Sequence, residues 1–147
     1  MQVKHILVPV DFSDTAQAAL LWAAELAERY GARLEMLHVY PVPGYVLPDG
    51  FVLASPEVHR DVDARARARL AQWLEIANRN RAIDITCAVS CGQPAAEILR
   101  RADDGNADLI VMGAHGLSGL ALFLMGSNTD RVVRHAKVPV VVVPRGV

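Results

Sequence analysis

A glycine-rich pattern in the last third of the sequence suits the binding of a phosphate-bearing ligand. Two residues separate Gly113 from Gly116, and Gly126 and Ser127 follow after nine more. Since glycine lacks a Cβ atom, its backbone can approach a ligand closely or adopt a positive φ. A helix that opens at Gly126 and Ser127 would offer unpaired N–H groups at its positive end, where phosphate oxygens bind well. Glycines also mark turns, however, and Ser127 and Asp130 have the spacing of a helix cap.

His115 lies inside this pattern, and a neutral imidazole can serve as a general base or as a metal ligand. No Asp, Glu or second histidine stands near it at ligand spacing. We therefore interpret His115 as a ligand contact placed by its backbone, and we predict no metal site made of protein side chains alone. Residues 113–126 contain no Lys or Arg to offset charge in phosphoryl transfer, and the sequence has no P-loop motif. The pattern favours binding over strong catalysis.

Hydrophobic periodicity predicts the strands and helices that would position these residues. Apolar runs predict strands at 6–10, 34–40, 108–112 and 138–143, and alternation over 83–89 predicts an edge strand with one wetter face. Helices are predicted over 14–30, over 57–80, from Pro94 through Leu99, and over 127–136.

Local signals bound some of these elements. Asp14 and Gln17 have the spacing of a capping pair at the start of the first helix, and Gly31 marks its end. The segment Pro41–Pro56 holds four prolines and two glycines, so we predict a long loop there.

Strands that alternate with helices in this way predict an α/β fold. We expect a single domain over residues 1–147, with one doubly wound, Rossmann-like parallel sheet of five strands and helices on both faces. In the strand order 3-2-1-4-5 the reversal lies between the first and fourth strands. Ligands of open α/β sheets bind outside the carboxyl ends of the strands at that reversal. Asp11 follows the first strand and Gly113 follows the fourth, so both polar segments would flank the predicted site.

The charge balance argues against nucleic acid or an anionic membrane as a partner. Fifteen basic and sixteen acidic residues give a net charge of −1. Arg65, Arg67 and Arg69 lie on a predicted helix among acidic residues, and we interpret them as a solvated face. The first apolar run is too short for a signal peptide, so we expect a cytoplasmic protein. Cys87 and Cys91 lack CxxC spacing, which favours two free thiols.

The sequence resembles the universal stress protein family over its whole length. The pattern Gly113-x2-Gly116-x9-Gly126-Ser127 is similar to the nucleotide motif of that family. The segments 6–13, 107–116 and 132–140 resemble the family as well. Members with the full motif bind ATP, so the resemblance implies ATP, accompanied by Mg²⁺, as the ligand here.

The resemblance also implies which residues contact the nucleotide. Asp11 and Val39 would hold the adenosine part. Gly113, His115 and Gly116 would lie along the ribose and phosphates. The complete predicted site comprises Pro9, Val10, Asp11, Val39, Met112, Gly113, Ala114, His115, Gly116, Gly126, Ser127 and Asn128, of which the last three would hold the phosphate end.

Three functional hypotheses follow. The first is a regulatory ATP-binding protein of the stress response that holds nucleotide and signals through a protein partner whose identity the sequence does not give. The second is an enzyme, either a slow ATPase or an autophosphorylating protein with Ser127 or Ser118 as the acceptor. The third treats the glycines only as turns. The nine-residue spacing and the position at the strand-order reversal favour a binding site over turns.

The last predicted strand suggests how the chain assembles. Val140–Val143 are four valines between Pro139 and Pro144, at an edge of the predicted sheet. An uncharged edge is an aggregation hazard unless something covers it. We predict a homodimer whose interface includes Val140, Val141 and Val142, as the resemblance to universal stress proteins also implies. The alternative is that the end of the chain or a helix shields this edge.

Overall fold

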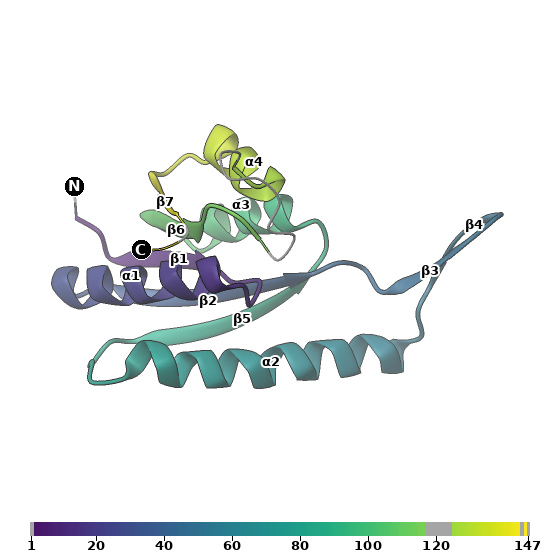
Figure 1. The fold of residues 1–147 in the computed structure, drawn as a ribbon, viewed down its shortest axis with the longest axis horizontal. Helices are drawn as coiled ribbons and strands as arrows, with labels where there is room; N and C mark the ends of the chain where they lie inside the picture. The colour runs from purple at the N-terminus through teal and green to yellow at the C-terminus, as the bar shows by residue number, and fades with distance from the viewer. Residues whose placement is uncertain (1, 117–124, 145, 147) are drawn as a thin grey trace.

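A five-stranded parallel sheet forms the centre of the molecule (Figure 1). The computed structural model describes residues 2–116, 125–144 and 146. The strands of the sheet are β1 (His5–Pro9), β2 (Arg33–Tyr40), β5 (Ile85–Cys91), β6 (Leu109–Gly113) and β7 (Val140–Val143). Their order across the sheet is β5-β2-β1-β6-β7. These are the five predicted strands in the predicted order, so the α/β fold is confirmed.

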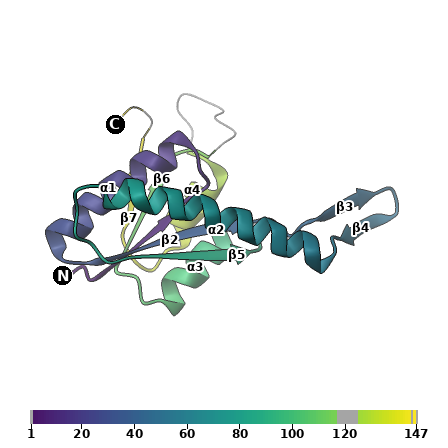
Figure 2. The same ribbon diagram turned by 90° about the horizontal axis from the view of Figure 1, so that it is seen from below.

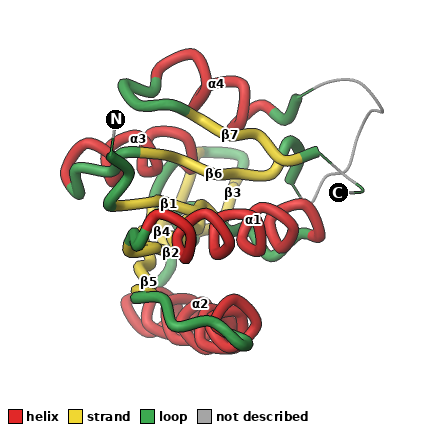
Figure 3. Tube along the Cα trace, turned by 90° about the vertical axis from the view of Figure 1, so that its left-hand side faces the viewer, coloured by secondary structure: helices red, strands yellow, loops and turns green. Residues whose placement is uncertain are grey.

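Helices cover both faces of the sheet, as seen in Figure 3, which views the molecule along the direction of the strands. Helices α1 (Asp14–Tyr30) and α2 (Pro56–Asn78) pack on one face, and α3 (Pro94–Asp104) and α4 (Ser127–His135) pack on the other. Strand β1 shows why its sequence is continuously apolar. Ile6 and Val8 join the core beneath α1 and α2, whereas Leu7 joins the core beneath α3 and α4. All three side chains are fully buried.

The N-cap of helix α1 lies one residue before the predicted cap. The N-cap is Ser13, which has extended backbone angles and accepts a hydrogen bond on Oγ from the Ala16 N–H at 3.2 Å. Asp14 is already helical, so the prediction of Asp14 as the cap is wrong. The helix ends at Gly31, as predicted, because glycine adopts the left-handed conformation (φ 63°) without a Cβ clash.

The segment Pro41–Pro56 is a β-hairpin rather than the predicted loop. Strands β3 (Gly44–Leu47) and β4 (Gly50–Leu53) pair antiparallel across the turn residues Pro48 and Asp49. The prolines that suggested a loop lie in the turn and at the ends, where proline does not interrupt strand pairing. Figures 1 and 2 show this hairpin extending away from the rest of the molecule.

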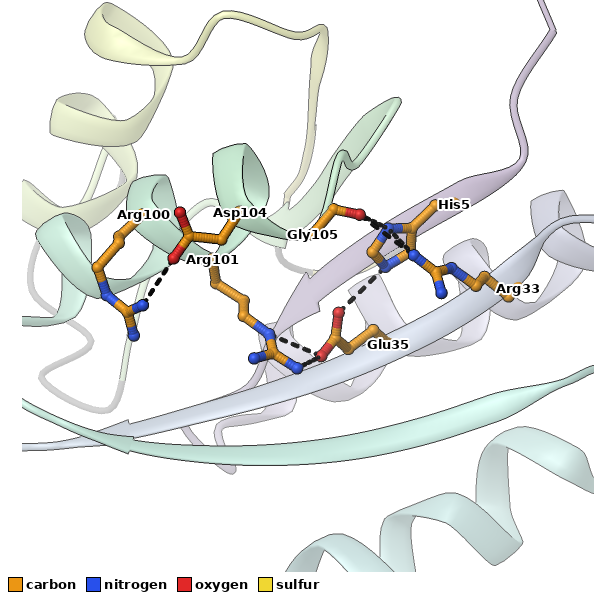
Figure 4. A network of polar contacts seen from close by, with 7 residues as sticks. All are labelled: His5, Arg33, Glu35, Arg100, Arg101, Asp104 and Gly105. Carbon is orange, nitrogen blue, oxygen red and sulfur yellow. Dashed lines mark hydrogen bonds and ion pairs between the residues drawn. The ribbon is translucent and has the colours of Figure 1, made fainter.

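An ion-pair network closes the end of the sheet at which the strands begin (Figure 4). The buried Glu35 carboxylate lies 3.1 Å from His5 Nε2, and its other oxygen accepts hydrogen bonds from the Arg101 guanidinium. Arg33 Nη2 lies 3.0 Å from His5 Nδ1 and donates to the Gly105 carbonyl. These contacts join β1 and β2 to the end of α3.

Within the part of the chain that the structure describes, no helix has both the length and the apolar character needed to cross a membrane.

Candidate functional site

A cavity of about 220 Å³ lies where the parallel strands end. It is lined by residues at the carboxyl ends of β1, β2 and β6 and by the first turns of α1, α3 and α4. Strands β1 and β6 are neighbours, and the strand order reverses between them. The cavity is therefore at the point of the sheet where open α/β folds bind their ligands.

The structure brings together eleven of the twelve predicted site residues. The residues that line the cavity are Pro9, Val10, Asp11, Val39, Met112, Gly113, His115, Gly116, Gly126, Ser127 and Asn128. Ala114 is buried and does not line it. Its N–H donates to the Val143 carbonyl and its carbonyl accepts from the Gly126 N–H, both at 2.8 Å. Ala114 thus fixes the loop after β6 to β7 and to the start of α4.

Five further residues of the cavity wall were not predicted from the sequence: Ala16, Leu37, Pro94, Ile98 and Thr129. Three of them, Ala16, Pro94 and Thr129, belong to the first turns of helices. The predicted topology already placed the starts of these helices at this end of the sheet. Pro94 could have been found in this way, because the helix that it opens follows an edge strand ending on the same side.

Two threonines hold the loop that carries Gly113 and His115. The Thr15 hydroxyl donates to the His115 carbonyl, and the Thr129 hydroxyl donates to the Gly113 carbonyl at 2.9 Å. A Cβ atom on Gly113 would lie 2.8 Å from Thr15 Oγ1 and 2.9 Å from its backbone carbon. Glycine is required at position 113 because the backbone there passes directly over α1. The φ of Gly113 is not positive, so the close approach, and not an unusual backbone angle, is the reason.

The Asp11 carboxylate is held against the same loop from the other side. Its Oδ1 accepts hydrogen bonds from the Ser13 N–H, at 3.0 Å, and from the Ser13 hydroxyl. Its Oδ2 faces Gly116, because a Cβ atom there would lie only 2.7 Å away. One carboxylate oxygen is therefore used to order the turn before α1, while the other lies in the cavity wall between β1 and β6.

The turn that presents Asp11 is anchored by Phe12. Phe12 has a φ of +65°, which is unfavourable for a bulky residue. Its ring lies 4.6 Å from the His38 ring and meets the Trp73 ring edge-on at 5.3 Å, measured between centroids. The guanidinium of Arg69 lies 4.0 Å above the same ring. Packing from β2 and α2 thus holds the strained turn beside the cavity.

Of the three helices that begin at the cavity, only α4 begins without a side-chain cap. Ser13 caps α1, and Gln93 caps α3 by accepting the Ala96 N–H at 2.7 Å. The N-cap of α4 is Gly126, which has no side chain, and Ser127 is the first helical residue. The prediction of Ser127 as a helix cap is therefore wrong. Among the described residues, nothing caps the first N–H groups of α4, so they can bind an anion in the cavity.

His115 adds a second free hydrogen-bonding group. Its Nε2 is a buried side-chain atom without a hydrogen-bond partner among the residues that the structure describes. Buried polar atoms are almost always paired, so His115, which lines the cavity, is a candidate hydrogen-bond partner for a ligand. Across residues 2–116, 125–144 and 146, no group of three or more His, Cys, Asp or Glu residues is arranged to hold a metal ion.

Comparison with known proteins places the chain in a family. The model of the universal stress protein family matches residues 2–144. A universal stress protein of Thermus aquaticus, encoded in the QAH/OAS sulfhydrylase 3′ region, is 35% identical over 142 residues. That alignment covers 95% of this chain and 98% of the relative.

Solved structures agree. The universal stress protein UspA from Lactobacillus plantarum superposes with a TM-score of 0.82 at 33% identity, covering 97% of this chain and 99% of the other. A universal stress protein in complex with cAMP gives a TM-score of 0.73 at 27% identity, with 98% of each chain covered. The family protein from Archaeoglobus fulgidus in complex with dAMP gives 0.68 at 25% identity, with 97% and 99% covered.

Proposed function

The chain belongs to the universal stress protein family, and from this premise we propose that it binds ATP and acts as a regulatory protein in a stress response. The observation that carries the proposal is the uncapped start of α4, which lies beside the Gly113–Gly116 loop in one cavity. Two related structures hold adenine nucleotides, cAMP and dAMP, which supports the same class of ligand here.

The proposed roles follow the order of the cavity wall. Asp11 and Val39, at the ends of β1 and β2, would hold the adenosine part. Gly113, His115 and Gly116 would lie along the ribose and phosphates, with His115 Nε2 supplying a hydrogen bond. The first turn of α4, at Gly126, Ser127 and Asn128, would receive the phosphate end through its N–H groups. Ala114 would hold the loop in place without touching the nucleotide.

Magnesium is proposed to accompany the triphosphate. Residues 113–126 contain no Lys or Arg, so little protein charge is available there to neutralise the phosphates. Mg²⁺ is commonly bound by substrate phosphates with few protein ligands, which suits a site that has one carboxylate, Asp11, in its wall. The ion would neutralise charge on the phosphates when bound.

The regulatory role is proposed over the enzymatic one because the described cavity wall holds no lysine or arginine that could stabilise phosphoryl transfer. Autophosphorylation at Ser127 is the alternative, since this side chain is exposed at the start of α4. Ser118, the other candidate acceptor, lies outside the described residues. Steady-state phosphate release should stay well below the enzyme range of about 1–1,000 per second. Release within that range, abolished by a cavity substitution, would favour the enzyme.

A homodimer through β7 is proposed as the assembly, and an unidentified regulatory protein as the further partner. Strand β7 is at one edge of the sheet, and the Val141 side chain is 36% exposed there. A second copy paired along Val140, Val141 and Val142 would cover both edges at once. Lysine at Val141 should weaken the dimer by placing an unpaired charge in the interface, and light scattering at micromolar concentration measures this directly.

The nucleotide itself is tested by mass spectrometry of the protein as purified, followed by calorimetric titration with ATP, ADP and AMP. We expect bound adenine nucleotide and a measurable Kd for ATP. A protein that carries no nucleotide and binds none at millimolar concentration would refute the proposal.

A further inference from the structure

The β3–β4 hairpin is an apolar arm that the rest of the molecule leaves uncovered. Seven of the fourteen large hydrophobic side chains that are exposed among the described residues lie within residues 42–53, which we call the arm. They are Val42, Tyr45, Val46, Leu47, Phe51, Val52 and Leu53, and their exposed fractions run from 44% at Val42 to 85% at Val46. Figures 1 and 2 show the arm extending away from the sheet in two perpendicular views.

Both faces of the arm are apolar. Residues paired across an antiparallel hairpin share a face, and the pairs here are Tyr45 with Val52 and Val46 with Phe51. Each pair is therefore on the face opposite to the other. Asp49, in the turn, is the only charged residue between Pro41 and Pro56. The charges by which edge strands usually resist pairing with other chains are absent from these two strands.

An isolated two-stranded hairpin is at best marginally stable in water. Covering it by folding back onto its own domain would bury one face and leave the other exposed. The adjoining helix α2 does not cover the arm either. Helix α2 spans about 35 Å at 1.5 Å per residue, and its buried residues begin only at Ala66. Its first turns lie outside the core, and Val58 there is exposed.

We infer that the arm is a self-association element whose occupant is a second copy of this chain. Two arms related by a twofold axis cover one another, and each also reaches the domain of the partner, so both faces become buried. Isologous contacts of this kind present the same patch from both copies, and an arm whose two strands carry no charge is complementary to itself.

The exposed apolar area of the arm is large enough for an interface with a second copy of the chain. Seven side chains at these exposures offer on the order of 500 Å² of apolar area. A stable interface buries about 800 Å² per partner, of which about 57–65% is apolar. One arm therefore supplies most of the apolar area that one partner of a stable interface buries. The arm of the second copy supplies the same area on the other side. The inference does not depend on nucleotide binding or on pairing through β7.

The test is the molar mass in solution, measured by light scattering at micromolar concentration. Val46→Glu and Tyr45→Glu each place a charge on one face of the arm. A third variant replaces residues 44–53 by an Asn-Gly turn, which can close the chain because the Ala54 N–H already donates to the Pro43 carbonyl at 3.0 Å. The matched control is Tyr30→Glu, on an exposed aromatic of α1.

We expect the shortened chain and at least one glutamate variant to have half the mass of the unchanged protein, with thermal unfolding of the domain unaltered. Tyr30→Glu should keep the full mass. Combination with Val141→Lys separates the two contacts, because loss of both would give the monomer. An unchanged mass in the shortened chain would overturn the inference. So would binding of the unchanged protein, but not the shortened one, to phosphatidylcholine–phosphatidylglycerol vesicles without any change in mass.

Discussion

The two ends of the sheet use polar groups in opposite ways. Where the strands begin, Glu35 accepts hydrogen bonds from Arg101 and contacts His5, and Arg33 closes the network on Gly105 (Figure 4). Where the strands end, His115 Nε2 and the start of α4 keep hydrogen-bonding groups without a protein partner in the described residues. Both ends therefore use polar groups to join elements, but only the strand ends also keep some of these groups without a partner in the described residues.

Helix direction explains part of this difference. In a parallel α/β sheet the helices end beside the strand beginnings and begin beside the strand ends. Arg101, in the last turn of α3, places its cation near the negative end of that helix. The opposite end collects the positive ends of α1, α3 and α4, of which the first two are capped. A negative ligand is thus expected at one end only.

The largest effect should come from breaking the network at the strand beginnings. Glu35→Ala leaves His5 and Arg101 without their carboxylate, and Glu35 is only 5% exposed. Removing one member of a buried ion pair costs about 3 kcal/mol of unfolding free energy. The Kd for ATP should not change. Urea denaturation and titration of the same sample measure both quantities, and Glu25→Ala, which breaks an exposed pair with Arg29, should cost under about 1 kcal/mol. A loss of ATP affinity in Glu35→Ala would show that the two ends are coupled.

A smaller effect is expected at Asp108, which ties β6 to the start of β1. Its carboxylate accepts the Lys4 N–H at 2.8 Å and the His5 N–H at 3.0 Å, and these bonds hold its pKa below the usual value. Asp108→Ala should lower the unfolding free energy by about 2 kcal/mol at neutral pH.

The stability contributed by Asp108 should depend on pH in a defined direction. A carboxylate whose pKa is depressed by folding stabilises the protein above its unfolded pKa, and that stability is lost as the pH falls through the folded pKa. Urea denaturation should show the difference between Asp108→Ala and the unchanged protein shrinking in acid. A difference that stays constant down to pH 2 would contradict the assigned role.

The smallest stability effect should appear at the strand ends, at Thr129. Thr129→Val removes the hydroxyl that donates to the Gly113 carbonyl and leaves that acceptor unsatisfied, at a cost of about 1 kcal/mol. ATP affinity should fall severalfold, because Gly113 is no longer held to the first turn of α4. Thr86→Val, at an exposed position on β5, is the matched control. Equal losses in the two variants would show that the loop does not depend on Thr129.

The sequence predicted the sheet and most of the cavity because both depend on long-range patterns. Continuous apolar runs such as Ile6–Val10 mark doubly covered strands, and the strand order then brings Asp11 and Gly113 to one place. The residue that caps a helix was harder to predict. Ser13 rather than Asp14 caps α1 because the backbone angles, which the sequence does not specify, decide which of two adjacent polar residues lies outside the helix.

The hairpin was missed although a signal for it was present. Tyr45–Leu47 and Phe51–Leu53 favour strands, and the Asp49-Gly50 dipeptide is typical of a hairpin turn. The prolines around them favoured a loop instead. The cavity residue Thr129 was missed because its role depends on a contact with the Gly113 carbonyl, sixteen residues away, which no local pattern reveals.

Titration of ATP into Gly126→Val tests most directly whether the strand ends bind nucleotide. A Cβ atom at Gly126 would lie 3.4 Å from its nearest neighbour, the Ala114 carbonyl oxygen, which is an ordinary van der Waals contact. The added side chain would stand at the start of α4, where the phosphates are proposed to bind. We predict at least a tenfold loss of affinity, about 1.4 kcal/mol, with Arg131→Val on the same helix unaffected. Unchanged affinity in a folded Gly126→Val protein would contradict the account.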